Sequence, residues 1–245
     1  MSSNGSWLWP NAWRDTYPVL IQLDQVQRDV NVQDRLFWKD GDDFSDYSSS
    51  GVWNSIRASE PEVDWASIVW FAQCIPHHAF VMWLIMRRKL TTQDKILQWN
   101  TTRRNSMNMM CCLLCYENID SHDHLFFECK FSTQVWKTIR TKAGMGNVEA
   151  KWSVIVEWLQ LRARSKSAAN LVCRLIVAAS AYVIWQERNH HLFKNHASPP
   201  ENICASIFDI VRYKLMGLKF KNTPKVRILL EKWEIHGDSV VDDGG

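Results

Sequence analysis

The chain has 245 residues, of which 46% are apolar and 22% charged, as in an ordinary folded domain. Nine glycines and seven prolines are too few for a turn-rich all-β fold, so the composition favours helices. The net charge of +3 is unevenly spread, because residues 1–66 carry 5 Lys/Arg and 11 Asp/Glu (−6) and the remainder carries 24 and 15 (+9). The basic second half suits an anionic partner such as nucleic acid, and equally suits lysines that only keep helices soluble.

The N-terminal sequence MSSNGSWLWP lacks the basic and apolar regions of a secretory signal. We therefore expect an intracellular protein, nuclear or cytoplasmic and not secreted. In such reducing surroundings, clustered cysteines bind metal more often than they form disulfides. The most apolar run, residues 171–185, contains Arg174 and is too short to span a bilayer, so we interpret it as a buried helix and expect no membrane partner.

The predicted elements follow an irregular segment, residues 1–50, in which Trp, Pro and Asp are interleaved. A first helix is predicted just after Ser50. Apolar spacing, N-caps and breakers then predict helices over residues 63–76 (stopped by Pro76), 77–90, 91–100, 131–144, 152–165, 169–193, 198–216 and 226–235. No alternating strand pattern stands out, and the polar C-terminal tail is expected to be disordered.

One stretch between these helices, CCLLCYENIDSHDHLFFEC at residues 111–129, holds four cysteines and two histidines. Zinc takes four Cys or His ligands in a tetrahedron, in pairs delivered by tight local turns. Cys112 and Cys115 have C-x2-C spacing, and His124 and Cys129 have H-x4-C spacing. The stretch therefore predicts a CCHC site for one zinc ion. Four protein ligands leave no open position for water, so the ion is expected to be structural.

Two alternative ligands exist in the same stretch. Cys111 in place of Cys112 gives C-x3-C, which forms the compact hairpin less readily, and His122 in place of His124 gives H-x6-C. His124 is favoured because it leads into the apolar Leu-Phe-Phe, which can pack under the site. Cys111 and His122 are then bystanders, with His122 expected at the surface.

The competing interpretation is that these cysteines are core residues, since Cys is among the most buried residue types. That interpretation is preferred for the isolated cysteines on apolar helices, which are Cys74, Cys173 and Cys204. A second metal site at His190, His191 and His196 is not expected, because histidines are favoured at a helix C-terminus by its dipole.

The same residues resemble a known family. WASIVWFAQCIPHHAFVMWLIMRRKLTTQDKILQWN, followed by CLLC and DHLFFECKFSTQVWKTI, is similar to the reverse-transcriptase zinc-binding domain of plant non-LTR (LINE-type) retrotransposons. The resemblance covers about residues 44–140 and implies the same four zinc ligands. The flanks, residues 6–20 and 184–193, match more loosely. Departures are modest: Lys89 stands where Arg is usual, and Asp120 where Glu is common.

The resulting prediction is a mainly α protein, an irregular helical domain with a small CCHC loop followed by a C-terminal helical bundle or hairpin. Its expected divisions are an irregular segment 1–50, a reverse-transcriptase zinc-binding domain 51–146 with the zinc loop 111–129, a C-terminal helical region 147–236 and a tail 237–245.

We expect no enzymatic activity and no small-molecule substrate. Polymerase, RNase H and endonuclease motifs are not recognisable, nor is a nucleophile elbow, a Walker loop or a dinucleotide fingerprint. The acidic pair Asp242-Asp243 lies in the tail without an aromatic neighbour. The resemblance therefore implies a module derived from the C-terminal part of a retrotransposon reverse transcriptase that lacks the polymerase core.

The expected partners are RNA or single-stranded DNA, and the reverse transcriptase of the parent element. Basic residues on both sides of the zinc loop could contact phosphates, and an exposed Tyr116 could stack on unpaired bases. The basic candidates are Arg103, Arg104, Lys130, Lys137, Arg140 and Lys142. Two alternatives stay open: a zinc-stapled structural or protein-interaction domain, and a decayed retroelement fragment without activity.

Overall fold

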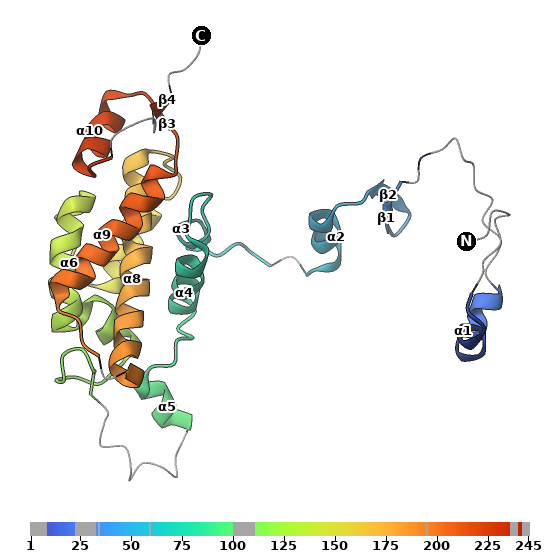
Figure 1. The fold of residues 1–245 in the computed structure, drawn as a ribbon, viewed down its shortest axis with the longest axis horizontal. Coiled ribbons are helices and arrows are strands. Elements are labelled where there is room, and N and C mark those ends of the chain that lie inside the picture. Colours follow the sequence, from blue (N-terminus) through green and yellow to red (C-terminus); the bar gives the residue numbers. More distant parts are fainter. Residues whose placement is uncertain are drawn as a thin grey trace. The chain divides into compact units, whose positions relative to one another are not determined.

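The computed structural model of the chain describes residues 9–22, 33, 35–58, 60–99, 111–194, 196–235 and 240–241. The chain divides into two compact units, Met1–Pro61 and Glu62–Gly245 (Figure 1). As the sequence predicts, the fold is mainly helical with little sheet. The four predicted divisions of the chain stay predictions.

The first unit is the smaller of the two. It contains α1 (Asn11–Thr16), a 3-10 turn (Pro18–Gln22), an antiparallel hairpin of β1 (Phe37–Asp40) and β2 (Asp43–Asp46), and α2 (Ser49–Ile56). The hairpin turns at Gly41, whose φ of 60° favours glycine. Ser48 caps α2 by accepting a hydrogen bond from the Gly51 N–H. None of the described side chains in this unit is buried, so these elements lack a core of their own.

The second unit is a packed set of helices. In chain order these are α3 (Ala66–Val69), α4 (Pro76–Met86), α5 (Gln93–Trp99), α6 (Lys130–Ala143), α7 (Trp152–Gln160), α8 (Ala168–Lys194), α9 (Pro200–Met216) and α10 (Pro224–Lys232). Two short strands form a parallel pair: β3 (Phe220–Lys221) follows α9, and β4 (Val240–Val241) follows α10. The predicted disordered tail thus includes a described strand at 240–241, and its other residues lie outside the described part.

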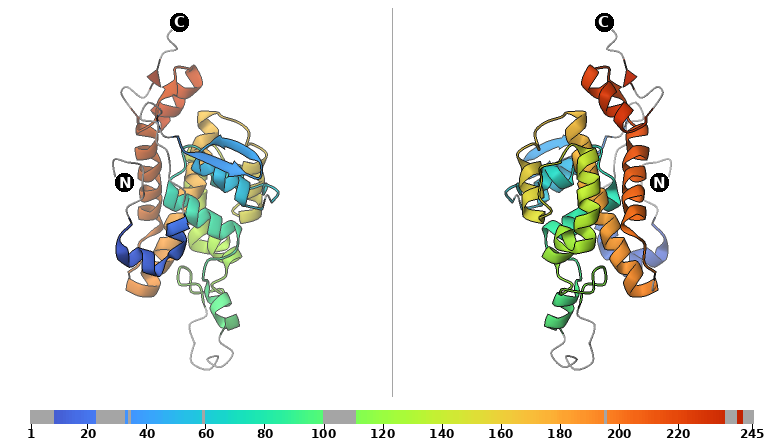
Figure 2. Two further views of the ribbon diagram at one scale, coloured as in Figure 1. Left: turned by 90° about the vertical axis from the view of Figure 1, so that its right-hand side faces the viewer. Right: turned by 90° about the vertical axis from the view of Figure 1, so that its left-hand side faces the viewer.

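Helix α8 lies at the centre of this unit. It packs against α4, α6 and α9, and α6 also packs along α9 (Figures 1 and 2). One continuous apolar core runs through these helices and includes side chains as far apart in sequence as Ile68 and Ile235. Burial of this apolar surface is the main stabilising contribution to the unit.

The length of α8 corrects one expectation. The apolar run at 171–185 belongs to a 27-residue helix that is long and apolar enough to cross a membrane by length and composition alone. The run at 171–185 was expected to be too short to span a bilayer, but the whole helix is long enough, so its length does not exclude a membrane span. In the structure, 61% of the helix's most apolar window is buried against its neighbours, which is typical of a core helix.

The helix ends near Pro76 differ from prediction, because this proline was expected only to end a helix. Pro76 was expected to stop the preceding helix, but α3 already ends at Val69 and Pro76 begins α4. Proline suits a first helical position because its missing N–H has no partner there in any case. The C-terminus of α6 matches prediction, with Gly144 at φ 78° next to Ala143.

Candidate metal centre

The first ligand pair lies on a tight turn of the zinc loop, residues 111–129. The Tyr116 N–H donates to the Cys112 carbonyl at 2.7 Å, and Cys111 and Ile119 form an antiparallel bridge. Tyr116 adopts a left-handed conformation, with φ at 58°. Because the chain folds back here, the side chains of Cys112 and Cys115, three positions apart in the sequence, point toward the same place.

The second pair closes a single turn, His124–Glu128, directly before α6. The Cys129 N–H donates to the His124 carbonyl at 2.7 Å, and Cys129 is the N-cap of α6. Between the ligands, Phe126 and Phe127 are fully buried. The Phe127 ring lies 4.9 Å from that of Trp136, which confirms that the Leu-Phe-Phe segment packs beneath the site.

The four predicted ligands come together. The ligand atoms of Cys112, Cys115, His124 and Cys129 all lie within 4.8 Å of one another. The Cys112 and Cys129 sulfurs are 3.8 Å apart, and the Cys115 sulfur is 3.3 Å from His124 Nε2. Tetrahedral zinc with Zn–S bonds near 2.3 Å places neighbouring sulfurs about 3.8 Å apart. The arrangement therefore fits one zinc ion with three sulfur ligands and one nitrogen ligand.

The two buried sulfurs also have the electrostatics of a metal site. The hydrogen bond that Cys112 donates lowers the pKa of the Cys129 thiol to about 5, helped by the N–H groups of Ser132 and Phe131 at the start of α6. The same hydrogen bond and burial raise the pKa of Cys112. Two sulfurs that share one proton are a site where a divalent cation can replace that proton and take both as thiolates.

The two bystanders differ in their surroundings. Cys111 is half-buried and outside the ligand cluster. The expectation that His122 lies at the surface is wrong, because its side chain is buried and its ring packs 5.2 Å from Phe126 and 6.5 Å from Trp152. Trp152 comes from α7, so the contact that buries His122 is distant in sequence.

An ion pair that the sequence did not predict holds the other side of the loop. The carboxylate of Asp120 accepts hydrogen bonds from Arg188 of α8, the shorter at 2.5 Å, and both side chains are buried. The Gln93 N–H also donates to Asp120, at 3.1 Å. The zinc loop is thereby joined to the C-terminal part of α8 and to the start of α5. The only sequence signal was the acidic residue shortly before His124, and nothing local pointed to Arg188.

The residues predicted to contact nucleic acid differ in exposure and in their contacts within the protein. Tyr116 is 66% exposed at the tip of the loop. Lys130 and Lys137 are exposed on α6, with Lys130 paired to Glu117. Arg140 instead donates to the Val148 carbonyl at 2.7 Å.

Lys142 also has an internal role, because its ammonium lies 5.0 Å from the Phe208 ring centre and 5.3 Å from that of Trp233. Arg103 and Arg104 lie outside the described residues.

Two of the other cysteines and one histidine have packing roles. Cys173 and Cys204 are buried, and burial raises the pKa of Cys173 to about 11. His191 contacts the buried carboxylate of Glu187, which also accepts from the Ser198 N–H and hydroxyl and so holds the α8–α9 connection. Among the described residues, the four-ligand cluster is the one group of potential ligands close enough to hold a metal.

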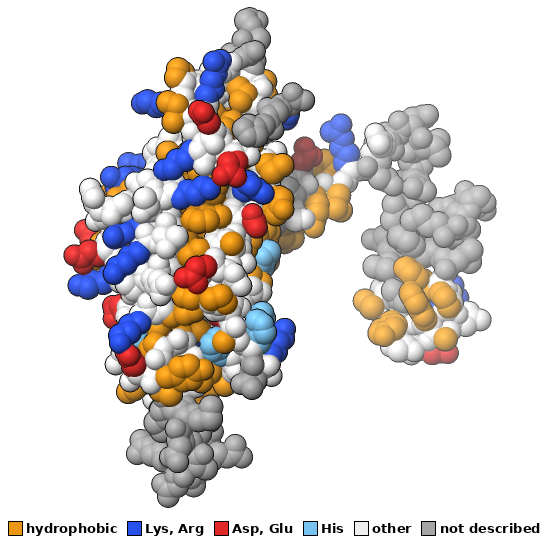
Figure 3. All heavy atoms as spheres, turned by 60° about the vertical axis from the view of Figure 1, so that its left-hand side comes forward, with side chains coloured by type: hydrophobic (Ala, Val, Ile, Leu, Met, Phe, Trp, Pro, Cys, Tyr) orange, Lys and Arg blue, Asp and Glu red, His pale blue; other side chains and the backbone are white. Residues whose placement is uncertain are grey.

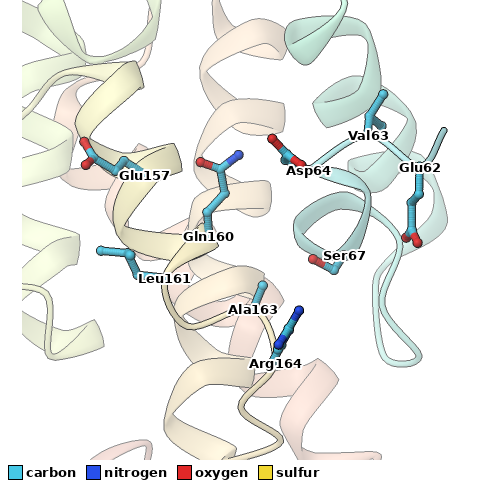
Figure 4. Close-up of a pocket in the computed structure, with 9 residues that line it drawn as sticks. All are labelled: Glu62, Val63, Asp64, Ser67, Glu157, Gln160, Leu161, Ala163 and Arg164. Carbon is cyan, nitrogen blue, oxygen red and sulfur yellow. The ribbon is translucent and has the colours of Figure 1, made fainter.

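A separate cavity of about 660 Å³ lies between the chain entering α3 and the end of α7 (Figure 4). Carboxylates line both sides, and none of the four metal ligands lines it. Its lining residues are Glu62, Val63, Asp64, Ser67, Glu157, Gln160, Leu161, Ala163 and Arg164.

A closed CCHC centre beside a helical core defines a domain with a structural zinc site. Residues 47–136 match the family model described as zinc-binding in reverse transcriptase. The matched segment is similar to this reverse-transcriptase-associated domain, and it contains all four ligands. The match ends within α6, so α7 to α10 lie beyond it. No curated protein and no solved structure matches the chain.

Proposed function

We propose that the chain is a zinc-stabilised nucleic-acid-binding module derived from the C-terminal part of a retrotransposon reverse transcriptase, without the polymerase core. RNA or single-stranded DNA is the proposed ligand, and the reverse transcriptase of the parent element a proposed partner. The observation that carries the proposal is the closed site inside a reverse-transcriptase-associated domain. A site with four protein ligands supports a structural role for zinc and gives a substrate no place to bind.

The chain's own residues explain what zinc would contribute. Cys112 and Cys115 would bind the ion from the loop, and Cys129 would bind it from the position that directly precedes α6. When bound, the ion cross-links an irregular loop to a helix, and its binding energy becomes folding energy. Phe126 and Phe127 then stay inserted in the core beneath the site.

The surface beside the site suits a single strand. Tyr116 is the exposed aromatic at the loop tip, and Lys130 and Lys137 follow on the exposed side of α6. Stacking on an aromatic ring tolerates any base, and lysines neutralise phosphates without regard to sequence. We therefore propose binding with little sequence preference and strong salt dependence.

The test measures binding of a fluorescent single-stranded RNA and its DNA counterpart by anisotropy over a range of salt concentrations. We expect log affinity to fall linearly with log salt, with a slope of roughly 0.7 for each phosphate contacted. Replacing both Lys130 and Lys137 by Gln should lower the slope by about 1.4, for two lost contacts.

The matched control replaces Lys166 and Lys225, two exposed lysines elsewhere on the second unit, by Gln. It removes the same charge and should leave the slope close to that of the wild type. A wild-type protein that binds neither strand, or binds with no salt dependence, contradicts the proposed function.

Two observations favour a second candidate, a zinc-stapled structural or protein-interaction domain. Arg140 and Lys142 are occupied by contacts inside the protein. On the face shown in Figure 3, Lys and Arg side chains are interspersed with Asp and Glu rather than gathered in one block. On this view, zinc fixes a fold whose partner is a protein such as the parent reverse transcriptase.

A further inference from the structure

From Ala79 to its end at Met86, helix α4 is apolar on all sides, although only part of its surface is covered. Its inner side faces α3 and α8, and its buried residues are His78, Ala79, Val81, Met82 and Ile85. A helix that is apolar all round is normally enclosed on all sides. We therefore expect a ligand or a partner to cover the outer side of α4.

Aromatic side chains form the outer side of α4. Phe80 is 52% exposed, and its ring centre lies 5.7 Å from that of the half-buried Trp83. Helix periodicity puts Arg87 on the same side, two turns after Phe80 and about 10 Å further along the axis. We call Phe80, Trp83 and Arg87 the α4 stripe.

The chain segment that carries the α4 stripe is basic. Residues 65–93 include no Asp or Glu, and their three basic residues are consecutive, Arg87 to Lys89. Arg88 is bound by both carboxylate oxygens of Asp123, at 3.0 and 2.8 Å. Arg87 and Lys89 are exposed, and no ion pair engages them within the described part of the chain.

The Arg88–Asp123 pair also connects the stripe to the metal centre. Asp123 directly precedes the ligand His124, so the bidentate pair fixes the basic end of α4 against the zinc loop. Arg88 has a left-handed backbone, with φ at 50°, which turns the chain sharply after the helix. The zinc loop and the α4 stripe are thus held as neighbours by a direct contact.

We propose that the α4 stripe binds unpaired bases of a single-stranded nucleic acid, with Phe80 and Trp83 stacking on bases and Arg87 and Lys89 contacting phosphates. This inference rests on the proposed function and gives it a location. Flat apolar rings beside exposed cations that make no ion pair of their own complement a strand of bases and phosphates. A protein partner would be expected to meet mixed charges around the apolar centre.

The test compares Phe80→Ala with wild type, using a fluorescent oligouridylate of about 16 nucleotides, near the upper site size of single-strand-binding folds. Loss of one stacked base should weaken binding about tenfold. Arg87→Gln should lower the salt slope by roughly 0.7. The matched control is Tyr213→Ala, which removes an exposed ring from α9 and should leave affinity unchanged.

Cross-linking of wild-type protein to the same strand carrying 5-iodouracil gives a second measurement that does not depend on variant folding. We expect the cross-linked peptide to lie within residues 76–89. Variant folding is checked by zinc content and helical circular dichroism.

The possible failures are distinguishable. Wild-type binding that Phe80→Ala leaves intact, with cross-links confined to other segments, overturns the α4 location and leaves the proposed function standing. No wild-type binding overturns both. A concentration-dependent dimer that Phe80→Ala abolishes, without effect on nucleic-acid binding, shows the stripe to be a contact between copies and also overturns the inference.

Discussion

The zinc loop and the central helix α8 are held in place by different kinds of interaction. Most side chains along α8 between Val172 and Ile184 are buried against other helices, so its stability is spread over many apolar contacts. The loop at 111–129 depends on a few discrete groups, the four ligands and the Asp120–Arg188 pair. Losing a metal ligand should therefore damage the loop more than losing one apolar side chain damages α8.

The largest expected effect is loss of a ligand. Cys112→Ser should abolish zinc binding and destabilise the domain by several kcal/mol, since structural zinc contributes about 10–16 kcal/mol in small zinc-finger peptides. Removing zinc with a chelator should have a similar effect. Zinc content and the urea midpoint measure both changes.

Two controls sharpen this contrast. Cys111→Ser should keep zinc, because Cys111 lies outside the cluster. Ile176→Ala in α8 should cost about 2–5 kcal/mol while zinc content stays the same. Equal loss of zinc in the Cys111 and Cys112 variants would contradict the assignment of ligands.

The second effect concerns the buried ion pair. Asp120→Leu or Arg188→Leu alone leaves one buried charge without its partner and should cost about 3–5 kcal/mol. The double variant should cost less than the sum of the two single changes, because it leaves no unpaired charge. Urea denaturation of the four proteins gives the coupling energy. Strictly additive costs would show that the pair does not hold the loop to α8.

The smallest expected effect is a pH dependence of the stability of the packed helices, through His78 of α4. Burial, with a smaller contribution from His77, lowers the pKa of His78 from 6.5 to about 4. The unfolded chain therefore takes up this proton first, and His78 reduces stability as pH falls from about 6.5 to 4. Above pH 6.5 both states are neutral at this residue, and it has no such effect.

His78→Phe should flatten that part of the stability curve. The ring of His78 packs 4.4 Å from Tyr182 of α8, so phenylalanine can retain the packing. Protonation of zinc-bound thiolates in acid affects both proteins alike, and the difference between their denaturation curves isolates His78. Identical slopes for the two proteins between pH 4 and 6.5 would contradict this explanation.

The metal centre could be predicted from the sequence because its determinants are local. C-x2-C and H-x4-C each close within one turn, and the four ligands fall within eighteen residues. The mainly helical fold was also predictable from apolar spacing. Helix ends were less so, as at Pro76, because proline both ends and begins helices.

The features that the sequence did not predict depend on contacts between residues that are distant in sequence. Asp120 and Arg188 are 68 residues apart, and neither has a local pattern that identifies the other. His122 was expected at the surface because it is not one of the four ligands, but Trp152 of α7 packs against it and it is buried. Arg140 stays a predicted phosphate contact, but no local pattern indicated its hydrogen bond to the Val148 carbonyl.

Zinc X-ray absorption on the purified protein, with metal content measured on the same sample, tests the central claim most directly. The geometry predicts one zinc per chain, coordinated by three sulfurs at about 2.3 Å and one nitrogen at about 2.0–2.1 Å. Folded protein without zinc, or a shell of two sulfurs and two nitrogens, would contradict the assignment of Cys112, Cys115, His124 and Cys129 as the four ligands.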